Sequence, residues 1–238
     1  MCGIAGIFDT RRPLTPEDHA LVERMATVVA HPGADDAGTG VGGRVGFGHR
    51  RLSVIDLSPN GHQPMSNEDG TIWITYNGEV YNFAELKARH RLVEKGHRFR
   101  SATDTEVLVH LYEELGPAMA KELNGIFAYA IFDSRKNELH LARDPFGVKP
   151  LFYTWRDGRF LFGSEIKCLL EDPLVPREVD LQSLHDFLTF DYIPGEQTAF
   201  RGILEVKPAH RMTVDGDGRT ATERFFDLSF EEDESLDE

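Results

Sequence analysis

Residues 126–162, IFAYAIFDSRKNELHLARDPFGVKPLFYTWRDGRFLF, decide the fold class. Within this stretch, turn-forming sequences separate four apolar segments, 126–133, 138–142, 151–155 and 160–162. Short aliphatic and aromatic segments bounded by Gly, Pro, Asn and Asp are typical of β-strands joined by tight connections. We therefore expect four successive antiparallel strands in this part of the chain.

The rest of the chain contains runs of expected helices and runs of expected strands. Helices are expected from Pro16, where Thr15 can cap the first turn, and over 82–94, 105–115, 117–123, 165–170 and 181–190. Strands are expected over 2–8, 44–56 and 71–76, with a C-terminal hairpin over 211–214 and 220–226, whereas 31–43 and 58–70 are expected as loops. Runs of strands and runs of helices indicate an α+β fold with antiparallel sheets rather than a parallel sheet.

The composition excludes several classes of protein. The chain has 238 residues and a net charge of −14, so a basic surface for nucleic acid is not expected. Cys2 and Cys168 are the only cysteines, which excludes a disulfide framework and fits a reducing compartment. No apolar run approaches the roughly 20 residues of a membrane span, and no signal peptide is visible. We expect a cytoplasmic protein that binds neither nucleic acid nor membrane.

The acidic residues gather at one end. Residues 227–238 contain seven Asp and Glu residues and no Lys or Arg. Such a segment is typical of a solvated tail, and it is also compatible with the start of a truncated linker. We expect one domain over 1–226, followed by this acidic tail at 227–238.

Cys2 is the first candidate for chemistry. Removal of Met1 would leave a thiol and a free α-amine on one residue, and an α-amine has a reference pKa of about 7.7–8.0. An amine next to a thiol can act as the base that activates a nucleophile. The alternative is a small buried cysteine without a chemical role.

Three further segments contain groups that could bind a polar substrate. Asn77 and Gly78 are either a hairpin turn or an oxyanion hole, since a side-chain amide and a backbone N–H can both donate to one oxygen. Arg50 and Arg51, in an apolar strand context, are either one exposed and one paired arginine or a source of a guanidinium that binds a carboxylate with two hydrogen bonds. Asp104 is either a helix N-cap or a group that binds a substrate amine. The ten histidines show no metal-ligand spacing with cysteines or acids, so no metal site is expected.

Together these motifs resemble a known family. The chain is similar to class II (N-terminal cysteine) glutamine amidotransferase domains, and specifically to the glutaminase domain of glutamine-hydrolysing asparagine synthetases. The resemblance is carried by MCGIAGIF (1–8), RLSVID (51–56), YNGEVYN (76–82), TDTE (103–106), NGIFAYAIFD (124–133) and ARDPFGVKPLFY (142–153). It implies an N-terminal-nucleophile (Ntn) hydrolase fold, a four-layer αββα sandwich of two antiparallel sheets.

The resemblance also implies roles for individual residues. Cys2 would attack the side-chain amide of L-glutamine, with its own α-amine as base and acid, and the thioester would be hydrolysed to glutamate. Asn77 and Gly78 would form the oxyanion hole. Arg51 would bind the α-carboxylate of glutamine, and Glu79 and Asp104 its α-ammonium. Backbone groups of Leu52, Ser53, Val54 and Ile55 would line the pocket.

Two departures from the family pattern bear on these expectations. Relatives usually have His-Arg-Gly-Pro-Asp where this chain has His31-Pro32-Gly33-Ala34-Asp35, so a guanidinium is missing from that loop. The Ser-Gly-Gly-Leu-Asp-Ser loop of the synthetase domain is also absent, so no cofactor is expected in this domain. ATP and Mg would belong to the synthetase domain.

The identity of the ammonia acceptor stays open at this point. It could be a synthetase domain or a separate subunit. Whether the chain also forms a homodimer is a separate question that the sequence leaves open. The domain could also be a stand-alone glutaminase subunit of another amidotransferase pathway, or a catalytically silent module that binds glutamine for regulation.

Overall fold

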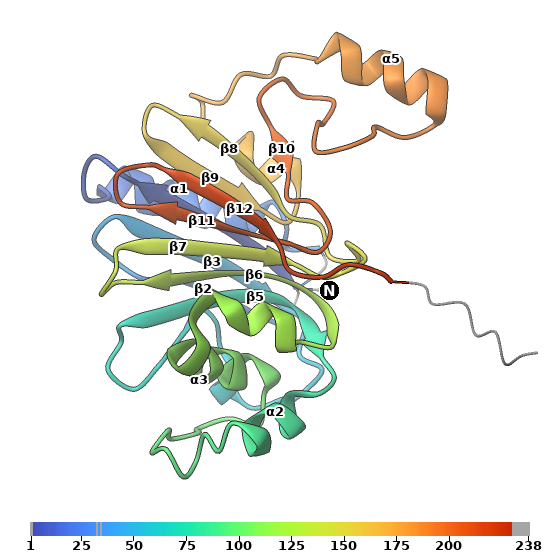
Figure 1. Cartoon of the computed structure of the whole chain (residues 1–238). Coiled ribbons are helices and arrows are strands. Elements are labelled where there is room, and N and C mark those ends of the chain that lie inside the picture. Colours follow the sequence, from blue (N-terminus) through green and yellow to red (C-terminus); the bar gives the residue numbers. More distant parts are fainter. Residues whose placement is uncertain (1, 32, 34, 230–238) are drawn as a thin grey trace, which may run out of the picture.

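Two antiparallel sheets of six strands each form the centre of the molecule (Figure 1). The computed structural model describes residues 2–31, 33 and 35–229. The first sheet has the order β10 (Leu204–Glu205), β8 (Phe152–Arg156), β9 (Arg159–Gly163), β1 (Gly3–Asp9), β3 (Val45–Arg51) and β2 (Asp36–Gly40). The second has the order β12 (Thr220–Arg224), β11 (His210–Asp215), β7 (Glu138–Arg143), β6 (Gly125–Asp133), β5 (Ile72–Val80) and β4 (Met65–Ser66).

The two sheets pack face to face through a shared apolar core. Strand β1 lies between β9 and β3, and its side chains alternate between two environments. Ile4 and Phe8 belong to the cluster between the sheets, which also contains Phe47 and Phe162. Ala5 and Ile7 point the other way and pack against the helices that cover the first sheet. The first strand of the chain is therefore buried on both faces.

Helices cover both outer faces of the sandwich. The first sheet is covered by α1 (Pro16–Thr27), which Thr15 and Asp18 cap reciprocally, and by α4 (Ile166–Leu169). The second sheet is covered by α2 (Phe83–Arg89), α3 (Asp104–Leu115) and the 3₁₀ helix η2 (Gly116–Glu122). This arrangement confirms the predicted α+β class and the αββα sandwich.

Helix α5 (Leu181–Phe190) stands apart from both sheets, at the upper right of Figure 1. Its apolar side chains Leu181, Leu184, Phe187 and Leu188 are all exposed. Asp180 caps its first turn by accepting a hydrogen bond from the Ser183 N–H. Among the residues that the structure describes, no helix is both long and apolar enough to span a bilayer.

Several elements differ from the sequence expectation. The expected loop at 31–43 contains the edge strand β2, which pairs with β3 despite two glycines among its five residues. The expected helix at 82–94 ends at Arg89. The Asn82 side chain does not cap this helix; its Nδ2 donates to the Glu122 carbonyl and its Oδ1 accepts from the Asn124 N–H. Local sequence patterns do not predict these features, because they depend on partners that are far away in the sequence.

The core between the sheets gives a first prediction. Phe8→Ala should lower the free energy of unfolding by about 3–5 kcal/mol, because it removes a fully buried aromatic ring and leaves a cavity. Urea denaturation followed by circular dichroism measures the change. Leu174→Ala, at a half-exposed position, is the matched control and should change stability by less than about 0.5 kcal/mol. Equal effects of the two substitutions would contradict the assigned core.

Candidate active site around Cys2

Cys2 lies directly before β1, at the end of the central strand of its sheet. Its Sγ is 3.4 Å from the Leu52 N–H, which donates to it, and 3.7 Å from the Leu52 carbonyl oxygen, to which the thiol can donate. Leu52 follows β3, the neighbour of β1, so the pairing of these two strands holds the thiol in place. The side chain remains partly exposed, whereas Cys168 is fully buried.

A cavity of about 220 Å³ opens beside this thiol. Of the ten predicted site residues, nine line it: Cys2, Arg51, Leu52, Val54, Ile55, Asn77, Gly78, Glu79 and Asp104. They come from segments that are far apart in the sequence and that the two sheets bring together. Ser53 is the exception, because it lines a neighbouring hollow with Asp35 and His62, and its N–H donates to the Asp35 carboxylate.

Asn77 and Gly78 lie inside strand β5, so the hairpin-turn interpretation is wrong. Asn77 pairs with Ala128 and Gly78 with Phe127 across the β5–β6 ladder. A Cβ atom at Gly78 would lie 2.3 Å from the Ile126 carbonyl oxygen, which explains why glycine is needed there. Asn77 is buried, and its Oδ1 has no hydrogen-bond partner among the described residues.

The edge of β5 that faces away from β6, and that continues beyond the short pairing with β4, determines where the Gly78 N–H points. The Tyr76 N–H donates to Gln63 Oε1, and the Val80 N–H donates to Asp104 Oδ2, so both point away from β6. Backbone N–H groups two residues apart on a strand share one edge. The N–H of Gly78, between these two, therefore points to the same edge, toward the cavity.

Asp104 lies at the first residue of α3 with its carboxylate turned into the site. Its Oδ2 accepts from the Tyr76 hydroxyl at 2.7 Å and from the Val80 N–H at 2.9 Å. Burial raises the pKa of this carboxyl above its ordinary value, although these hydrogen bonds act in the opposite direction. Asp104 does not cap α3, because Thr103 occupies the N-cap position and accepts from the Glu106 N–H.

Arg51 is buried, and its guanidinium is hydrogen-bonded to the backbone. Its guanidinium donates to the backbone carbonyls of Ser58, Ile55 and Asp56. Gly61 allows this approach, since a Cβ atom there would lie 2.0 Å from Arg51 Nη2. The cation thus stabilises the loop over 55–58 while it lines the cavity, and both Nη2 hydrogens are directed at carbonyl oxygens.

Lys149 is a site residue that is not among those predicted from the sequence. It lines the cavity and is largely buried, on the loop between β7 and β8. The fully buried carboxylate of Asp144 orders this loop by accepting from the N–H groups of Phe146, Val148 and Lys149. The sequence feature that could have indicated this role is the single lysine within the Pro/Gly loop over 144–150, next to a buried strand.

Burial and charge act in opposite directions on the Cys2 thiol. Burial raises the pKa of the thiol, and the Leu52 N–H and the positive charges of Arg51 and Lys149 lower it. The net effect is a raised pKa. At Cys168 burial dominates and raises the pKa to about 12, which makes that thiol inert near neutral pH.

Comparison with known proteins shows the family to which the chain belongs. The family model described as a glutamine amidotransferase domain matches residues 1–226. The chain belongs to the glutamine amidotransferase family. An asparagine synthetase [glutamine-hydrolyzing] of Bacillus subtilis (strain 168) is 38% identical over 97% of this chain and 36% of its own length. A putative asparagine synthetase of Methanocaldococcus jannaschii is 31% identical over 95% of this chain and 46% of its own length.

This glutamine amidotransferase domain therefore spans about a third to a half of the length of the curated relatives it matches. Among solved structures, glutamine phosphoribosylpyrophosphate amidotransferase from B. subtilis matches 94% of this chain with a TM-score of 0.64 at 21% identity. A glutamine aminotransferase class-II domain protein from Silicibacter pomeroyi matches with a TM-score of 0.51 at 14% identity. These likenesses support the Ntn-type fold.

Two of the sequence expectations fall on positions that the structure does not describe. Pro32 and Ala34, where the family pattern has Arg and Pro, lie outside the described residues, as does the acidic tail from 230 to 238. Gly33 lies close to the end of β3, because a Cβ atom there would be 2.5 Å from the Arg50 carbonyl.

The position of Lys149 gives a second prediction. Lys149→Met removes a positive charge that stabilises the Cys2 thiolate, so the pKa of the thiol should rise and its alkylation should become half-maximal at higher pH. Iodoacetamide labelling at a series of pH values, resolved by peptide mass spectrometry, measures this shift, and Cys168 serves as the unreactive internal reference. Lys121→Met is the matched control, because Lys121 is exposed and pairs with Glu223. An unchanged profile for Lys149→Met would contradict the assigned influence of Lys149.

Proposed function

We propose that this domain hydrolyses the side-chain amide of L-glutamine through a thioester on Cys2 and delivers ammonia to an acceptor. The observation that carries the proposal is a single small cavity. It collects a thiol at the chain's N-terminal strand, an amide and a backbone N–H on β5, one arginine and two acids.

Removal of Met1 by an aminopeptidase must precede the reaction, because it places the α-amine on Cys2. This amine takes the thiol proton, and the thiolate attacks the side-chain carbonyl carbon of glutamine. The C–N bond then breaks, the amine returns its proton to the leaving group, and ammonia departs. Water adds to the thioester by the same route, which releases glutamate and restores the thiol.

The developing oxyanion would be bound by the Asn77 side-chain amide and the Gly78 N–H. Both donors belong to consecutive residues of one ordered strand, so they are positioned before the reaction begins. Support comes from the geometry of β5, where neighbouring N–H groups on the same edge bind Gln63 and Asp104 and that of Gly78 faces the cavity. Stabilisation of this charge lowers the free energy of the transition state and leaves the free energy of bound glutamine unchanged, so the barrier falls.

The remaining groups match the charged end of glutamine. Glu79 and Asp104 provide negative charge for the α-ammonium, and Arg51 and Lys149 provide positive charge for the α-carboxylate. Since Arg51 already donates to three backbone carbonyls, it would need to exchange one of them to bind the carboxylate with two hydrogen bonds. Leu52, Val54 and Ile55 would provide the wall along the aliphatic part of the substrate.

We further propose that the acceptor of ammonia is an asparagine synthetase-like domain or subunit. The curated relatives with asparagine synthetase names are two to three times as long as this chain, which leaves room in them for such a domain. ATP and Mg would act there, and this domain's reaction would need no cofactor.

The third prediction tests the nucleophile. Cys2→Ala should abolish glutamate formation from glutamine, because the reaction has no other route to the thioester. A coupled glutamate dehydrogenase assay measures the product. Cys168→Ala, which changes the other thiol, should retain activity. Glutamate formation by Cys2→Ala at the wild-type rate would refute the mechanism.

The fourth prediction tests the oxyanion hole. Asn77→Ala should lower kcat by about 10²–10³-fold and change KM little, since the lost hydrogen bond forms mainly in the transition state. Steady-state kinetics with glutamine separates the two parameters. Gln182→Ala removes an exposed amide on α5 and is the matched control. A rise in KM at constant kcat would instead assign Asn77 to substrate binding alone.

A further inference from the structure

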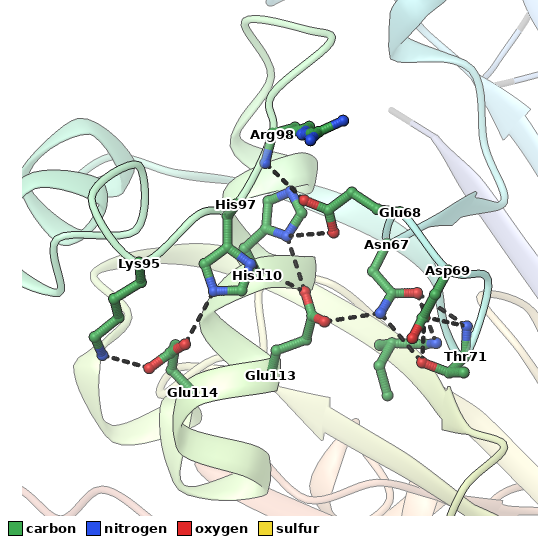
Figure 2. Close-up of polar contacts among 11 residues, drawn as sticks. Asn67, Glu68, Asp69, Thr71, Lys95, His97, Arg98, His110, Glu113 and Glu114 are labelled. Carbon is green, nitrogen blue, oxygen red and sulfur yellow. Dashed lines mark hydrogen bonds and ion pairs between the residues drawn. The ribbon is translucent and has the colours of Figure 1, made fainter.

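A second group of chemically active side chains lies in the helical layer over the second sheet, outside the cavity around Cys2. It consists of Glu68, His97, His110 and Glu113, which we call the His/Glu cluster (Figure 2). Glu68 lies in the turn between β4 and β5, His97 between α2 and α3, and His110 and Glu113 on α3. The spacing of the histidines does not indicate this cluster, because its members come from three segments.

The four side chains converge on one point. One nitrogen or oxygen from each lies within 4.8 Å of the corresponding atoms of the others. Glu113 Oε2 is 2.9 Å from His110 Nδ1 and 3.4 Å from His97 Nδ1, and Glu68 Oε2 is 3.8 Å from His110 Nδ1. Ligand atoms around a tetrahedral zinc ion lie roughly 3.4 Å apart, given bonds of about 2.0–2.2 Å. Small side-chain movements would bring all four atoms to that distance.

The opposite ends of three of these side chains are held by other groups. Glu68 Oε1 accepts from the Arg98 N–H, and Glu113 Oε1 accepts from Asn67 Nδ2. His97 Nε2 lies 3.0 Å from Glu114 Oε1, a carboxylate that also pairs with Lys95. Hydrogen bonds of this kind orient metal ligands, and a carboxylate behind a ligating histidine is common. Figure 2 shows these partners around the cluster.

The Nδ1 atom of His97 lies in a position that favours a cation beside it. If Nε2 of a neutral ring donates to Glu114, Nδ1 carries a lone pair and faces Glu113 Oε2, which is also an acceptor. Two facing acceptors repel unless a proton or a metal ion lies between them. His110 is almost fully buried, with 2% of its side chain exposed, and its ring packs against His97 and Phe99. Its Nε2 has no hydrogen-bond partner in the part of the chain that the structure describes.

We propose that the His/Glu cluster binds one divalent transition-metal ion of the zinc class. Two imidazole nitrogens and two carboxylate oxygens suit Zn²⁺, whereas Mg²⁺ and Ca²⁺ favour sites made of oxygen ligands alone. The ion would join the β4–β5 turn and the segment before α3 to the middle of α3. His110 lies six residues from Asp104 on the same helix, so the ion would also stabilise the element that carries an acid of the Cys2 cavity.

The experiment is a metal titration of the full, tag-free chain after treatment with a chelator. We expect one equivalent of Zn²⁺ to bind in isothermal titration calorimetry and to raise the midpoint of thermal unfolding. Co²⁺ in its place should give the visible absorption of four-coordinate cobalt. Mg²⁺ at the same concentration should produce neither effect.

Two variants assign the ligands. Glu68→Gln, at a partly exposed position, keeps the shape of the side chain and an oxygen for the Arg98 N–H, so the fold should persist while Zn²⁺ affinity falls at least tenfold. His97→Gln should abolish the cobalt spectrum. His185→Ala removes an exposed histidine beside Asp186 and is the matched control, expected to bind as the wild type does.

Three results would overturn the proposal. The first is the absence of Zn²⁺ binding at micromolar concentration, which would make the cluster a hydrogen-bonded network of histidines and carboxylates only. The second is binding that both Glu68→Gln and His97→Gln leave unchanged, with folding verified by circular dichroism. The third is an equal response to Mg²⁺.

Discussion

Strand β1 is buried on both faces, with Ile4 and Phe8 between the sheets and Ala5 and Ile7 against the helices. This double burial fixes the start of the chain at the centre of its sheet, between β9 and β3. Cys2 therefore cannot move far from Leu52, whose backbone N–H and carbonyl contact the thiol. Strand β5, beyond its short pairing with β4, faces the same cavity and supplies Asn77 and Gly78. The site therefore depends on packing of β1 that fixes Cys2, near the N-terminus, beside Leu52.

The sequence predicts much of this architecture. The four strands over 126–162 and the α+β class follow from local patterns of apolar and turn-forming residues, which report burial and turns directly. The grouping of Cys2, Arg51, Asn77, Glu79 and Asp104 in one cavity follows from the family resemblance, since no local pattern specifies contacts between segments this far apart.

Features that depend on long-range contacts are not predictable in this way. Asn-Gly at 77–78 has the composition of a turn, yet the ladder with β6 keeps it extended. The glycine-rich segment at 36–40 forms a strand only because β3 offers it an edge. Lys149 enters the cavity because buried Asp144 orders its loop, and the His/Glu cluster depends on three segments that meet around α3.

The proposed chemistry requires that the N-terminal thiol of a processed chain is the nucleophile for glutamine. Mass spectrometry of the protein after incubation with a diazoketone analogue of glutamine tests this requirement. We expect a chain without Met1 that carries one adduct on the sulfur of Cys2, with labelling suppressed by excess glutamine. A chain that retains Met1, or an adduct elsewhere that glutamine does not suppress, would contradict it.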